Sequence, residues 1–433
     1  MLFPFQKIGV EFLKAEPHRL LSDQMGLGKT IQALSAAAEL GVCSILVICP
    51  AIIKDTWAKH IEDWTTFDSR SIQILRTKSD IVSDKRVIIV NYELLYPQIS
   101  KKRNSVDGIL SQLIRNRKFG LCIVDEAHRL KEISAKITHV ILAKTGKRAP
   151  LISIAYRKWL LTGTPMPNRP IELFPILRTL APSTIEPYGT YEVFGNRFCD
   201  PKPNDYGINY DGASNVEELK ERLSKFMLRR EMKEVYAQLP ERLISPIYCQ
   251  VKLDISEKDT PLATLRKALG DAKIPFCVEY LQDKLESMKG KIVVFAYSRS
   301  VIEGIANHDK LAKYDPVFIY GSLTYEDKAF ALKQFKTDPN CRIIVLQYNA
   351  AGTGTDGLQQ HSNCMVMAEP DWSAGTFDQA IGRLHRIGQT ELVSVYPIIA
   401  RETLDESIFG VYNKKSKVID KVLRNGKRVK AVK

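Results

Sequence analysis

The chain has 433 residues, of which 45% are hydrophobic, so it is long enough for two or three domains and its composition argues against wholesale disorder. The formal net charge of +14 favours nucleic acid over a membrane as a partner, although a basic protein without a polyanionic partner is an equal alternative on charge alone. The eight cysteines include no CxxC pair, and no apolar run reaches transmembrane length, so neither a zinc site of that spacing nor a membrane span is expected.

Short apolar runs rich in valine and isoleucine alternate with helical stretches along the first half of the chain. Such runs are typical of buried parallel strands, and the alternation indicates a doubly wound sheet with helices on both faces. The expected strands lie at residues 19–23, 44–50, 86–92, 121–128 and 158–165.

The first of these strands leads into a glycine-rich segment, DQMGLGKT, at residues 23–30. Glycines let backbone N–H groups approach phosphates, and the N-terminus of a following helix favours bound anions. Lys29 is expected to reach the β- and γ-phosphates of a nucleotide, and the hydroxyl of Thr30 to ligate Mg²⁺. Asp23 stands where the strict P-loop pattern has its first glycine, so alone the segment is also compatible with a surface turn. The predicted nucleotide-binding residues here are Met25, Gly26, Leu27, Gly28, Lys29 and Thr30.

A second motif, DEAH, ends an apolar strand about a hundred residues later. In a parallel sheet it would emerge at the same edge as the glycine-rich segment, where ligands bind. Asp125 is expected to hold Mg²⁺, and Glu126 to orient and deprotonate the attacking water. His128 is expected to link the nucleotide to the next motif. The alternative is a solvated acidic turn, which the order and spacing of both motifs disfavour.

The alternation fails over residues 200–250, so the boundary between two lobes is expected there. Residues 216–239 read as one helix that ends before Pro240. In the second half, further apolar runs predict strands at residues 291–298, 316–320, 342–349, 363–370 and 393–400. We therefore expect lobe 1 at 1–230, a linker at 231–255, lobe 2 at 256–413 and a basic tail at 414–433. The tail holds nine lysines and arginines against one aspartate.

Two arginines near the end of lobe 2, Arg383 and Arg386, are three residues apart and would share a face if helical. Paired guanidinium groups can clamp a γ-phosphate and stabilise its transition-state charge. Coming from lobe 2, they would complete the nucleotide site when the lobes close. The alternative is a basic face that contacts solvent or a phosphate backbone.

Together these motifs resemble those of superfamily 2 motors, and specifically the Swi2/Snf2 ATPases, over nearly the whole chain. The likeness is carried by PFQKIGVEFL, DQMGLGKT, ICPAIIKDTW, IVNYELL, LTGTPMPN, YGSLTYEDKAFALKQF and DWSAGTFDQAIGRLHRIGQT. Residues 197–242 look like the lobe-joining region of the annealing-helicase (HARP-type) branch. The chain departs from that branch in having DEAH for DESH, in Lys328 where many relatives have arginine, and in an extra glycine near residues 352–356.

The resemblance implies roles for further residues. Gln6 would read the adenine, and Gln379, Gly354 and Asp356 would contact the nucleotide. Thr162, Gly163 and Thr164 would form, with His128, the coupling motif. The residues implied in DNA binding are Pro50, Asn91, Tyr92, Ser298, Arg299, Gly321, Ser322 and Trp372. Trp57 and Trp372 lie near motif segments, where base stacking is weighed against ordinary packing.

The resemblance also implies an α/β fold of two tandem RecA-like lobes, each a mainly parallel doubly wound sheet, and an ATP- and Mg²⁺-dependent translocase on duplex DNA. A strand-separating DNA or RNA helicase is the alternative, and a nucleotide-binding interaction protein with a degenerate ATPase is a third. We expect a monomer without a membrane partner, which acts on duplex and secondarily on forked or junction DNA. Motif-like sequence begins at residue 5, so no signal peptide is expected. The expected location is cytoplasmic or nucleoid-associated for a prokaryotic or viral source, and nuclear for a eukaryotic one.

Overall fold

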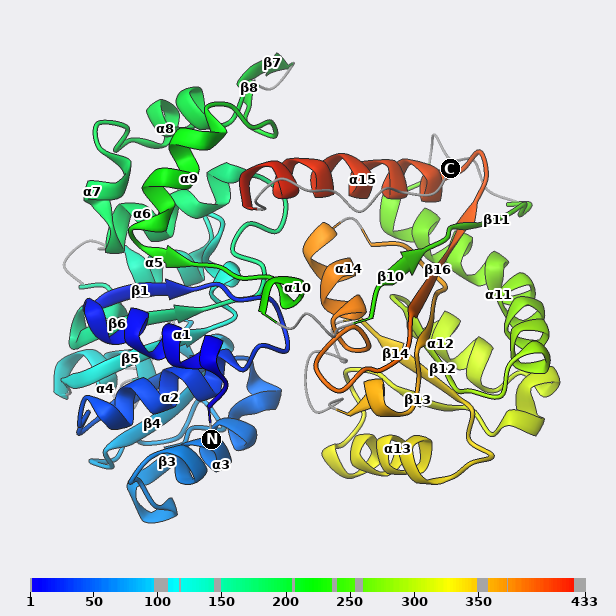
Figure 1. Ribbon diagram of the computed structural model, residues 1–433, viewed down its shortest axis with the longest axis horizontal. Coiled ribbons are helices and arrows are strands. Elements are labelled where there is room, and N and C mark those ends of the chain that lie inside the picture. Colours follow the sequence, from blue (N-terminus) through cyan, green and yellow to red (C-terminus); the bar gives the residue numbers. More distant parts are fainter. Residues whose placement is uncertain are drawn as a thin grey trace. The chain divides into compact units, whose positions relative to one another are not determined.

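The chain divides into two compact units, each built on a parallel sheet (Figure 1). Unit 1 is formed within residues 1–235 and includes the end of the last helix from Val418, and unit 2 is formed within residues 236–417. The computed structural model describes residues 2–96, 108–116, 118–143, 149–204, 207–235, 240–253, 260–348, 357–371 and 373–423. Each unit is a RecA-like lobe, as the sequence predicts.

The sheet of unit 1 has the strand order β3-β4-β2-β5-β6-β1-β9, with every neighbouring pair parallel. The predicted strands of the first half are all present, and two short edge strands, β3 and β9, are additional. The bounds are β1 His18–Leu21, β2 Ile45–Cys49, β3 Ile72–Ile74, β4 Val87–Asn91, β5 Phe119–Asp125, β6 Ala155–Leu161 and β9 Met227–Leu228.

Helices cover both faces of this sheet because the side chains of each strand alternate between two apolar cores. In β2, Leu46 and Ile48 pack with α4 to α6, whereas Ile45 and Val47 pack with α1 to α3. The helices are α1 Pro4–Ala15, α2 Lys29–Glu39, α3 Lys54–Trp64, α4 Ile109–Asn116, α5 Lys136–Leu142, α6 Phe174–Leu180, α7 Pro182–Ile185, α8 Tyr191–Phe198, α9 Val216–Ser224 and α10 Met232–Val235, with a small hairpin of β7 Lys202–Asn204 and β8 Gly207–Asn209.

The single helix predicted over residues 216–239 is wrong. Within the described residues, this stretch forms α9, then β9, then the short α10. The interruption occurs where Met227 and Leu228 pair in parallel with Leu20 and Leu21 of β1. Pairing with the sheet edge outweighs the helical propensity of the surrounding lysines, glutamates and leucines, and a two-residue strand has no periodic signal of its own.

The sheet of unit 2 has the order β10-β16-β15-β12-β14-β13, with β11 also paired to β16 and every pair parallel. The five predicted strands of the second half are present, and β10 and β11 lie inside the range predicted as linker. The strands are β10 Arg242–Ile244, β11 Ile247–Cys249, β12 Ile292–Ala296, β13 Val317–Ile319, β14 Ile343–Gln347, β15 Cys364–Met367 and β16 Val393–Ala400. The helices are α11 Leu262–Ser287, α12 Arg299–Ala306, α13 Tyr325–Thr337, α14 Ala374–Ile381 and α15 Leu404–Leu423.

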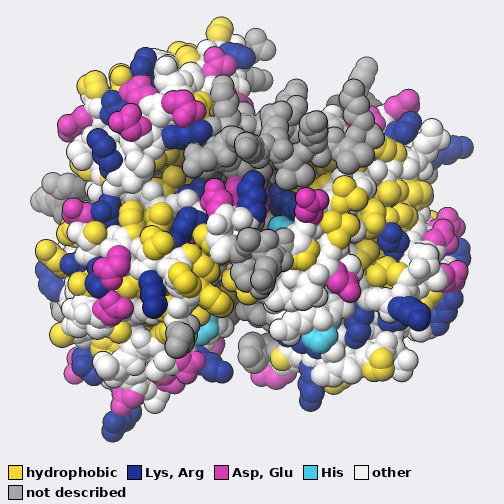
Figure 2. Space-filling model, viewed as in Figure 1, with side chains coloured by type: hydrophobic (Ala, Val, Ile, Leu, Met, Phe, Trp, Pro, Cys, Tyr) yellow, Lys and Arg dark blue, Asp and Glu magenta, His cyan; other side chains and the backbone are white. Residues whose placement is uncertain are grey.

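Charged side chains of both signs are interspersed among the described residues of the face shown in Figure 2. The range predicted as a basic tail begins inside α15, and residues 424–433 lie outside the described residues. None of the described helices is long and apolar enough to cross a membrane. All eight cysteines are free thiols within the described part of the chain, and Cys43 alone among them is exposed.

A buried ion pair anchors the start of α15 in unit 2. The ammonium of Lys273 on α11 lies 2.6 Å from a carboxylate oxygen of Asp405, and the side chains are only 1% and 4% exposed. The same oxygen accepts a hydrogen bond from the backbone N–H of Ala400 at the end of β16. Removing one partner of such a pair leaves an uncompensated buried charge.

We therefore expect Lys273→Met to lower the free energy of unfolding by about 3–5 kcal/mol, as measured by equilibrium urea unfolding. The double variant Lys273→Met/Asp405→Asn should recover most of that loss, because asparagine carries no charge and still accepts from Ala400. A loss below about 1 kcal/mol in the single variant would show that the pair is solvated in solution.

Candidate functional site

Three loops meet at one edge of the sheet of unit 1. The glycine-rich loop follows β1, residues 162–165 follow β6, and the DEAH residues end and follow β5. These strands are neighbours in the order β5-β6-β1, and all run in the same direction. Their carboxyl ends therefore bring together motifs that are far apart in the sequence.

The glycine-rich loop ends at Gly28, which caps the N-terminus of α2 in a left-handed conformation with φ of 73°. The left-handed conformation favours glycine, and a Cβ there would lie 2.6 Å from Nε2 of Gln6, so the Gln6 side chain would also have to move. Lys29 begins the helix, and its ammonium donates to the carbonyl oxygen of Asp23 at 2.8 Å. Burial lowers the pKa of Lys29, while the charges of Glu126, Asp23 and Asp125 raise it. Lys29 is thus a partly desolvated cation held by carbonyl oxygens, which a phosphate can replace.

Asp125 lies at the end of β5 with both carboxylate oxygens engaged. Oδ2 accepts from the indole N–H of Trp57 at 2.9 Å, and Oδ1 accepts from the backbone N–H of Glu126 at 2.9 Å. Burial raises the pKa of Asp125, and the charge of Glu126 raises it further, whereas Trp57 and Lys29 lower it. Trp57 is 2% exposed, so its ring packs inside the unit while its indole N–H binds this carboxylate. Of the two interpretations of Trp57, packing is the one the structure favours over base stacking.

Glu126 is joined to the loop after β6 through His128. Nδ1 of His128 lies 3.2 Å from Oε2 of Glu126 and 3.0 Å from the hydroxyl oxygen of Thr162. The Thr162 hydroxyl oxygen in turn accepts from the backbone N–H of Thr164 at 3.1 Å. The structure thus brings together the residues predicted as catalytic base and coupling motif.

Gly163 brings the coupling loop against the glycine-rich loop. A Cβ at this position would lie 2.7 Å from Cγ of Met25 and 3.4 Å from the ammonium nitrogen of Lys29. A larger residue here would require the Met25 side chain to move. Gln6 approaches the same loop from α1, where its Nε2 donates to the carbonyl oxygen of Leu27 and its Oε1 accepts from the N–H of Phe3.

This arrangement fits a nucleoside triphosphate with a divalent cation. A helix N-terminus, a lysine held by carbonyl oxygens and a partly buried carboxylate are groups that suit phosphates and a hard cation. Asp125 and Thr30 are the residues that would hold the cation. Among the described residues, no cluster of three or more His, Cys, Asp or Glu side chains could hold a metal ion.

In unit 2, α14 ends at Ile381, so Arg383 and Arg386 do not lie on a regular helix and their shared helical face is not formed. The chain turns after Gly382, and Arg383 is 8% exposed, whereas Arg386 is partly exposed. Gln379 lies in the last turn of α14 and is also partly exposed. The roles of these residues remain predictions.

The lobe 1 residues predicted to bind DNA are mostly turned into the unit. Pro50 follows β2 and is partly exposed. Asn91 is 5% exposed and accepts from the ammonium of Lys54 at 2.9 Å. Tyr92 is 2% exposed and donates its hydroxyl to the carbonyl oxygen of Asp125 at 2.5 Å. Tyr92 is thus part of the support of the acidic loop in this structure, and its contact with DNA stays a prediction.

Four of the lobe 2 residues predicted to bind DNA, Ser298, Arg299, Gly321 and Ser322, follow β12 or β13 at the carboxyl ends of these strands. Sequence reasoning missed two residues that organise them. Glu369, which is 2% exposed, accepts from the N–H and the hydroxyl of Ser298 at 2.7 and 2.8 Å. Gln347, at the end of β14, accepts from the N–H of Gly321 at 2.9 Å and donates to the carbonyl oxygen of Tyr297 at 3.1 Å. The sequence marked Gln347 and Glu369 only as polar residues that end or follow an apolar strand.

Arg299 and Ser322 have exposed side chains beside this cluster. The guanidinium of Arg299 lies 4.6 Å from the ring centre of Tyr320 and 2.9 Å from a carboxylate oxygen of Glu303. Lys328, which replaces the arginine of many relatives, donates to the carbonyl oxygen of Gly321 at 3.0 Å. The predicted residues Gly354, Asp356 and Trp372 lie outside the described residues.

Comparison with protein families matches residues 5–257 to the SNF2-related domain and residues 272–388 to the helicase conserved C-terminal domain. Among curated proteins, the chain is 31% identical over 446 residues to the SWI/SNF-related matrix-associated actin-dependent regulator of chromatin subfamily A-like protein 1 of Xenopus tropicalis. It is 30% identical over 462 residues to the DNA annealing helicase and endonuclease ZRANB3 of Bos taurus.

These alignments cover 96% and 99% of the chain but only 44% and 41% of the two relatives, so the chain spans less than half of their length. Among solved structures, the chain is similar to the Sulfolobus solfataricus SWI2/SNF2 ATPase core in complex with dsDNA. That likeness has 21% identity and a TM-score of 0.44, and it covers 98% of this chain and 97% of the other.

The charges around Asp125 make a testable prediction about its ionisation. Glu126→Gln should lower the pKa of Asp125, because it removes a neighbouring negative charge. Trp57→Phe should raise that pKa further, because the carboxylate loses a hydrogen bond to its charged form. Each shift should amount to a few tenths of a unit to about one unit, measured by NMR titration of ¹³C-labelled aspartate carboxyl groups.

Asp68 is the control in these titrations, because Arg70 and Ser71 lower its pKa to about 2 on an exposed loop. It should titrate identically in both variants. Shifts of Asp125 in the same direction in both variants would contradict the described arrangement.

Proposed function

The chain belongs to the SNF2-related domain family, and from this premise we propose that it is an ATP-dependent translocase on duplex DNA. The observation that carries the proposal is the meeting of Lys29, Asp125, Glu126 and Gly163 at one edge of the sheet of unit 1. If these segments were only solvated turns, there would be no reason for carbonyl oxygens to hold a lysine beside two carboxylates. The intact set also argues against a degenerate ATPase that only binds nucleotide.

In this proposal the glycine-rich loop and Lys29 hold the phosphates of ATP, and Gln6 contacts the adenine. Asp125 and Thr30 would hold Mg²⁺, and the bound ion would neutralise charge that develops on the phosphates. Glu126 orients the attacking water and takes its proton on a carboxylate oxygen. His128 would pass a change at Glu126 to Thr162, since its Nδ1 lies within 3.2 Å of both side-chain oxygens.

Unit 2 supplies the second part of the proposed cycle. We assign to Arg383 and Arg386 the stabilisation of charge on the transferred phosphoryl group when the two units close on ATP. Closure and release would then alternate with binding and hydrolysis. Gln379, on α14 just before these arginines, would contact the nucleotide in the same state.

Contact with DNA is assigned to the loops at the carboxyl ends of the strands of unit 2, with Ser298, Arg299, Gly321 and Ser322, and to Pro50 and the Asn91–Tyr92 turn in unit 1. Backbone N–H groups and short polar side chains at such edges suit phosphate contacts, which carry little sequence information. The relative ZRANB3 is named a DNA annealing helicase, so we propose forked or junction DNA as a preferred form of the duplex. Strand separation by a helicase is the alternative.

The chemical steps are tested by variants of unit 1 and unit 2 in a DNA-stimulated ATPase assay. Glu126→Gln should bind ATP normally and lose turnover, because the water loses its base. Lys29→Ala should weaken nucleotide binding itself. Arg386→Ala should bind ATP and lose a factor of about 10³–10⁵ in kcat, by analogy with arginine fingers. Normal turnover by Glu126→Gln would show that the catalytic assignment is wrong.

The nature of the movement is tested with a triplex. A motor that follows the backbone of an intact duplex should displace a triplex-forming third strand but should not unwind a simple forked duplex, because unpairing costs about 1.4 kcal/mol per base-pair step. ATPase stimulation by duplex DNA, single-stranded DNA and RNA should be compared in the same preparation. Robust unwinding of a long plain duplex would favour the helicase alternative.

A further inference from the structure

The last strand of unit 1 continues as an extended segment that runs beside the glycine-rich loop. The backbone N–H of Ser22 donates to the carbonyl oxygen of Leu228 at 2.7 Å. The backbone N–H of Gln24 donates to the carbonyl oxygen of Arg230 at 2.9 Å. The N–H of Met232 donates to the side chain of Gln24 at 2.7 Å. The first residues of the glycine-rich loop are therefore hydrogen-bonded to residues 228–232, which we call the exit segment.

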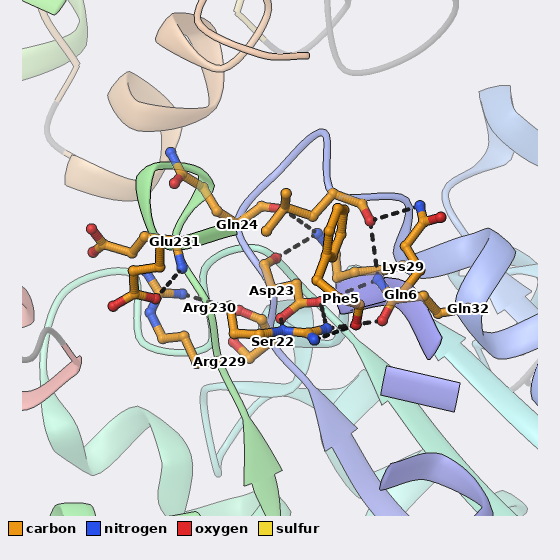
Figure 3. A network of polar contacts seen from close by, with 12 residues as sticks. Phe5, Gln6, Ser22, Asp23, Gln24, Lys29, Gln32, Arg229, Arg230 and Glu231 are labelled. Atoms are coloured by element: carbon orange, nitrogen blue, oxygen red, sulfur yellow. Dashed lines mark hydrogen bonds and ion pairs between the residues drawn. The ribbon is translucent and has the colours of Figure 1, made fainter. Parts of the chain in front are cut away.

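An ion pair between Asp23 and Arg230 joins the exit segment to the glycine-rich loop. Asp23 is fully buried, its Oδ1 accepts from Nε of Arg230 at 2.9 Å, and its Oδ2 accepts from Nε2 of Gln32 at 3.1 Å. Arg230 also donates to the carbonyl oxygen of Phe5 and to Oε1 of Gln32, the latter at 3.0 Å. Figure 3 shows Asp23 enclosed by these side chains, with Arg230 reaching it from the exit segment.

The backbone carbonyl group of Asp23 also binds Lys29. Its carboxylate binds Arg230, while its carbonyl oxygen accepts from the ammonium of Lys29 at 2.8 Å. If Lys29 leaves this carbonyl oxygen to bind phosphate, the hydrogen bonding of the Asp23 peptide changes. That peptide lies between residues 22 and 24, whose N–H groups pair with the exit segment.

The neighbouring Arg229 ties the exit segment to a second loop of the site. One of its terminal nitrogens donates to the carbonyl oxygen of Ser22 at 3.2 Å and to that of Gly163 at 3.0 Å. The exit segment therefore contacts both the glycine-rich loop and the coupling loop. Figure 3 shows Arg229 and Ser22, the residues of the first contact. On α1, a Cβ at Gly9 would lie 1.7 Å from Oε1 of Gln32, so α1 packs closely against the side chain that binds Asp23.

Simple anchoring of the edge strand is the plainer explanation, but three observations point beyond it. A buried ion pair is a weak source of net stability, because desolvation offsets the attraction. Asp23 replaces a glycine of the strict loop pattern, so the carboxylate stands inside the nucleotide-binding loop. The exit segment and the short α10 directly precede residue 236, where unit 2 begins along the chain.

We propose that Arg230 is a positioning residue that couples nucleotide binding at Lys29 to the exit segment, and so to the chain that enters unit 2. The inference rests on the proposed function, since it requires nucleotide at the glycine-rich loop. It adds a route to unit 2 that does not pass through Arg383 and Arg386. Arg230 itself has no role in contacting the phosphates.

Hydrogen–deuterium exchange of the full chain, with and without a non-hydrolysable ATP analogue, tests this coupling. In the unmodified protein the analogue should slow exchange at least about threefold in peptides of both the glycine-rich loop and the exit segment. In Arg230→Gln the analogue should still slow exchange in the loop but not in the exit segment. Asp23→Asn/Arg230→Gln should behave in the same way, and it leaves no buried charge should the single variant fail to fold.

Arg222→Gln is the matched control. Arg222 lies on α9 of the same unit, bonds to Glu218 and to the carbonyl oxygens of Thr184 and Glu186, and is 25% exposed. It should lose stability while keeping the response of both peptides to the analogue.

Three outcomes have different meanings in this experiment. An exit segment that does not respond in the unmodified protein would overturn the inference, and so would a full response in both Arg230 variants. Absence of any response in the loop itself would instead contradict ATP binding, and with it the proposed function.

Discussion

The parallel direction of the strands is the constraint on which the candidate site depends. Because β5, β6, β1 and β9 are consecutive neighbours in one sheet, the segments that follow them must emerge at one edge. DEAH, the coupling loop, the glycine-rich loop and the exit segment therefore meet, although 207 residues separate Asp23 from Arg230. The strand order brings these segments together, and side-chain contacts then fix their detailed positions.

Charge inside this edge is balanced locally, and that balance explains why the loops are so closely joined. Lys29 lies among carbonyl oxygens and the carboxylates of Asp23, Asp125 and Glu126, and each charge shifts the pKa of another in a direction that follows from its sign. At Asp23 the negative charge is offset by Arg230, and this ion pair joins the glycine-rich loop to the exit segment. At Asp125, burial and the neighbouring charge of Glu126 raise the pKa of the carboxylate, and the proposed cation would offset that concentration of negative charge.

The sequence was sufficient for the two lobes and for placing the glycine-rich and DEAH segments at the ends of strands of one sheet, because each depends on local residue order after a strongly apolar strand. It was insufficient for β9, a two-residue strand whose only cause is its pairing with β1. It could not assign Trp57 or Glu369, since their partners Asp125 and Ser298 lie 68 and 71 residues away. Arg383 and Arg386 would share a face only if they were helical, and that condition is not met because α14 ends at Ile381.

The distribution of the thiols gives this protein a built-in chemical handle. Burial raises the pKa of Cys122 and Cys277 to about 12, which keeps them protonated and poorly nucleophilic, whereas Cys43 is exposed in the turn between α2 and β2. A maleimide dye should therefore label unit 1 at one position without any cysteine being removed. One engineered cysteine on unit 2 would then complete a donor–acceptor pair for following the two lobes in single molecules.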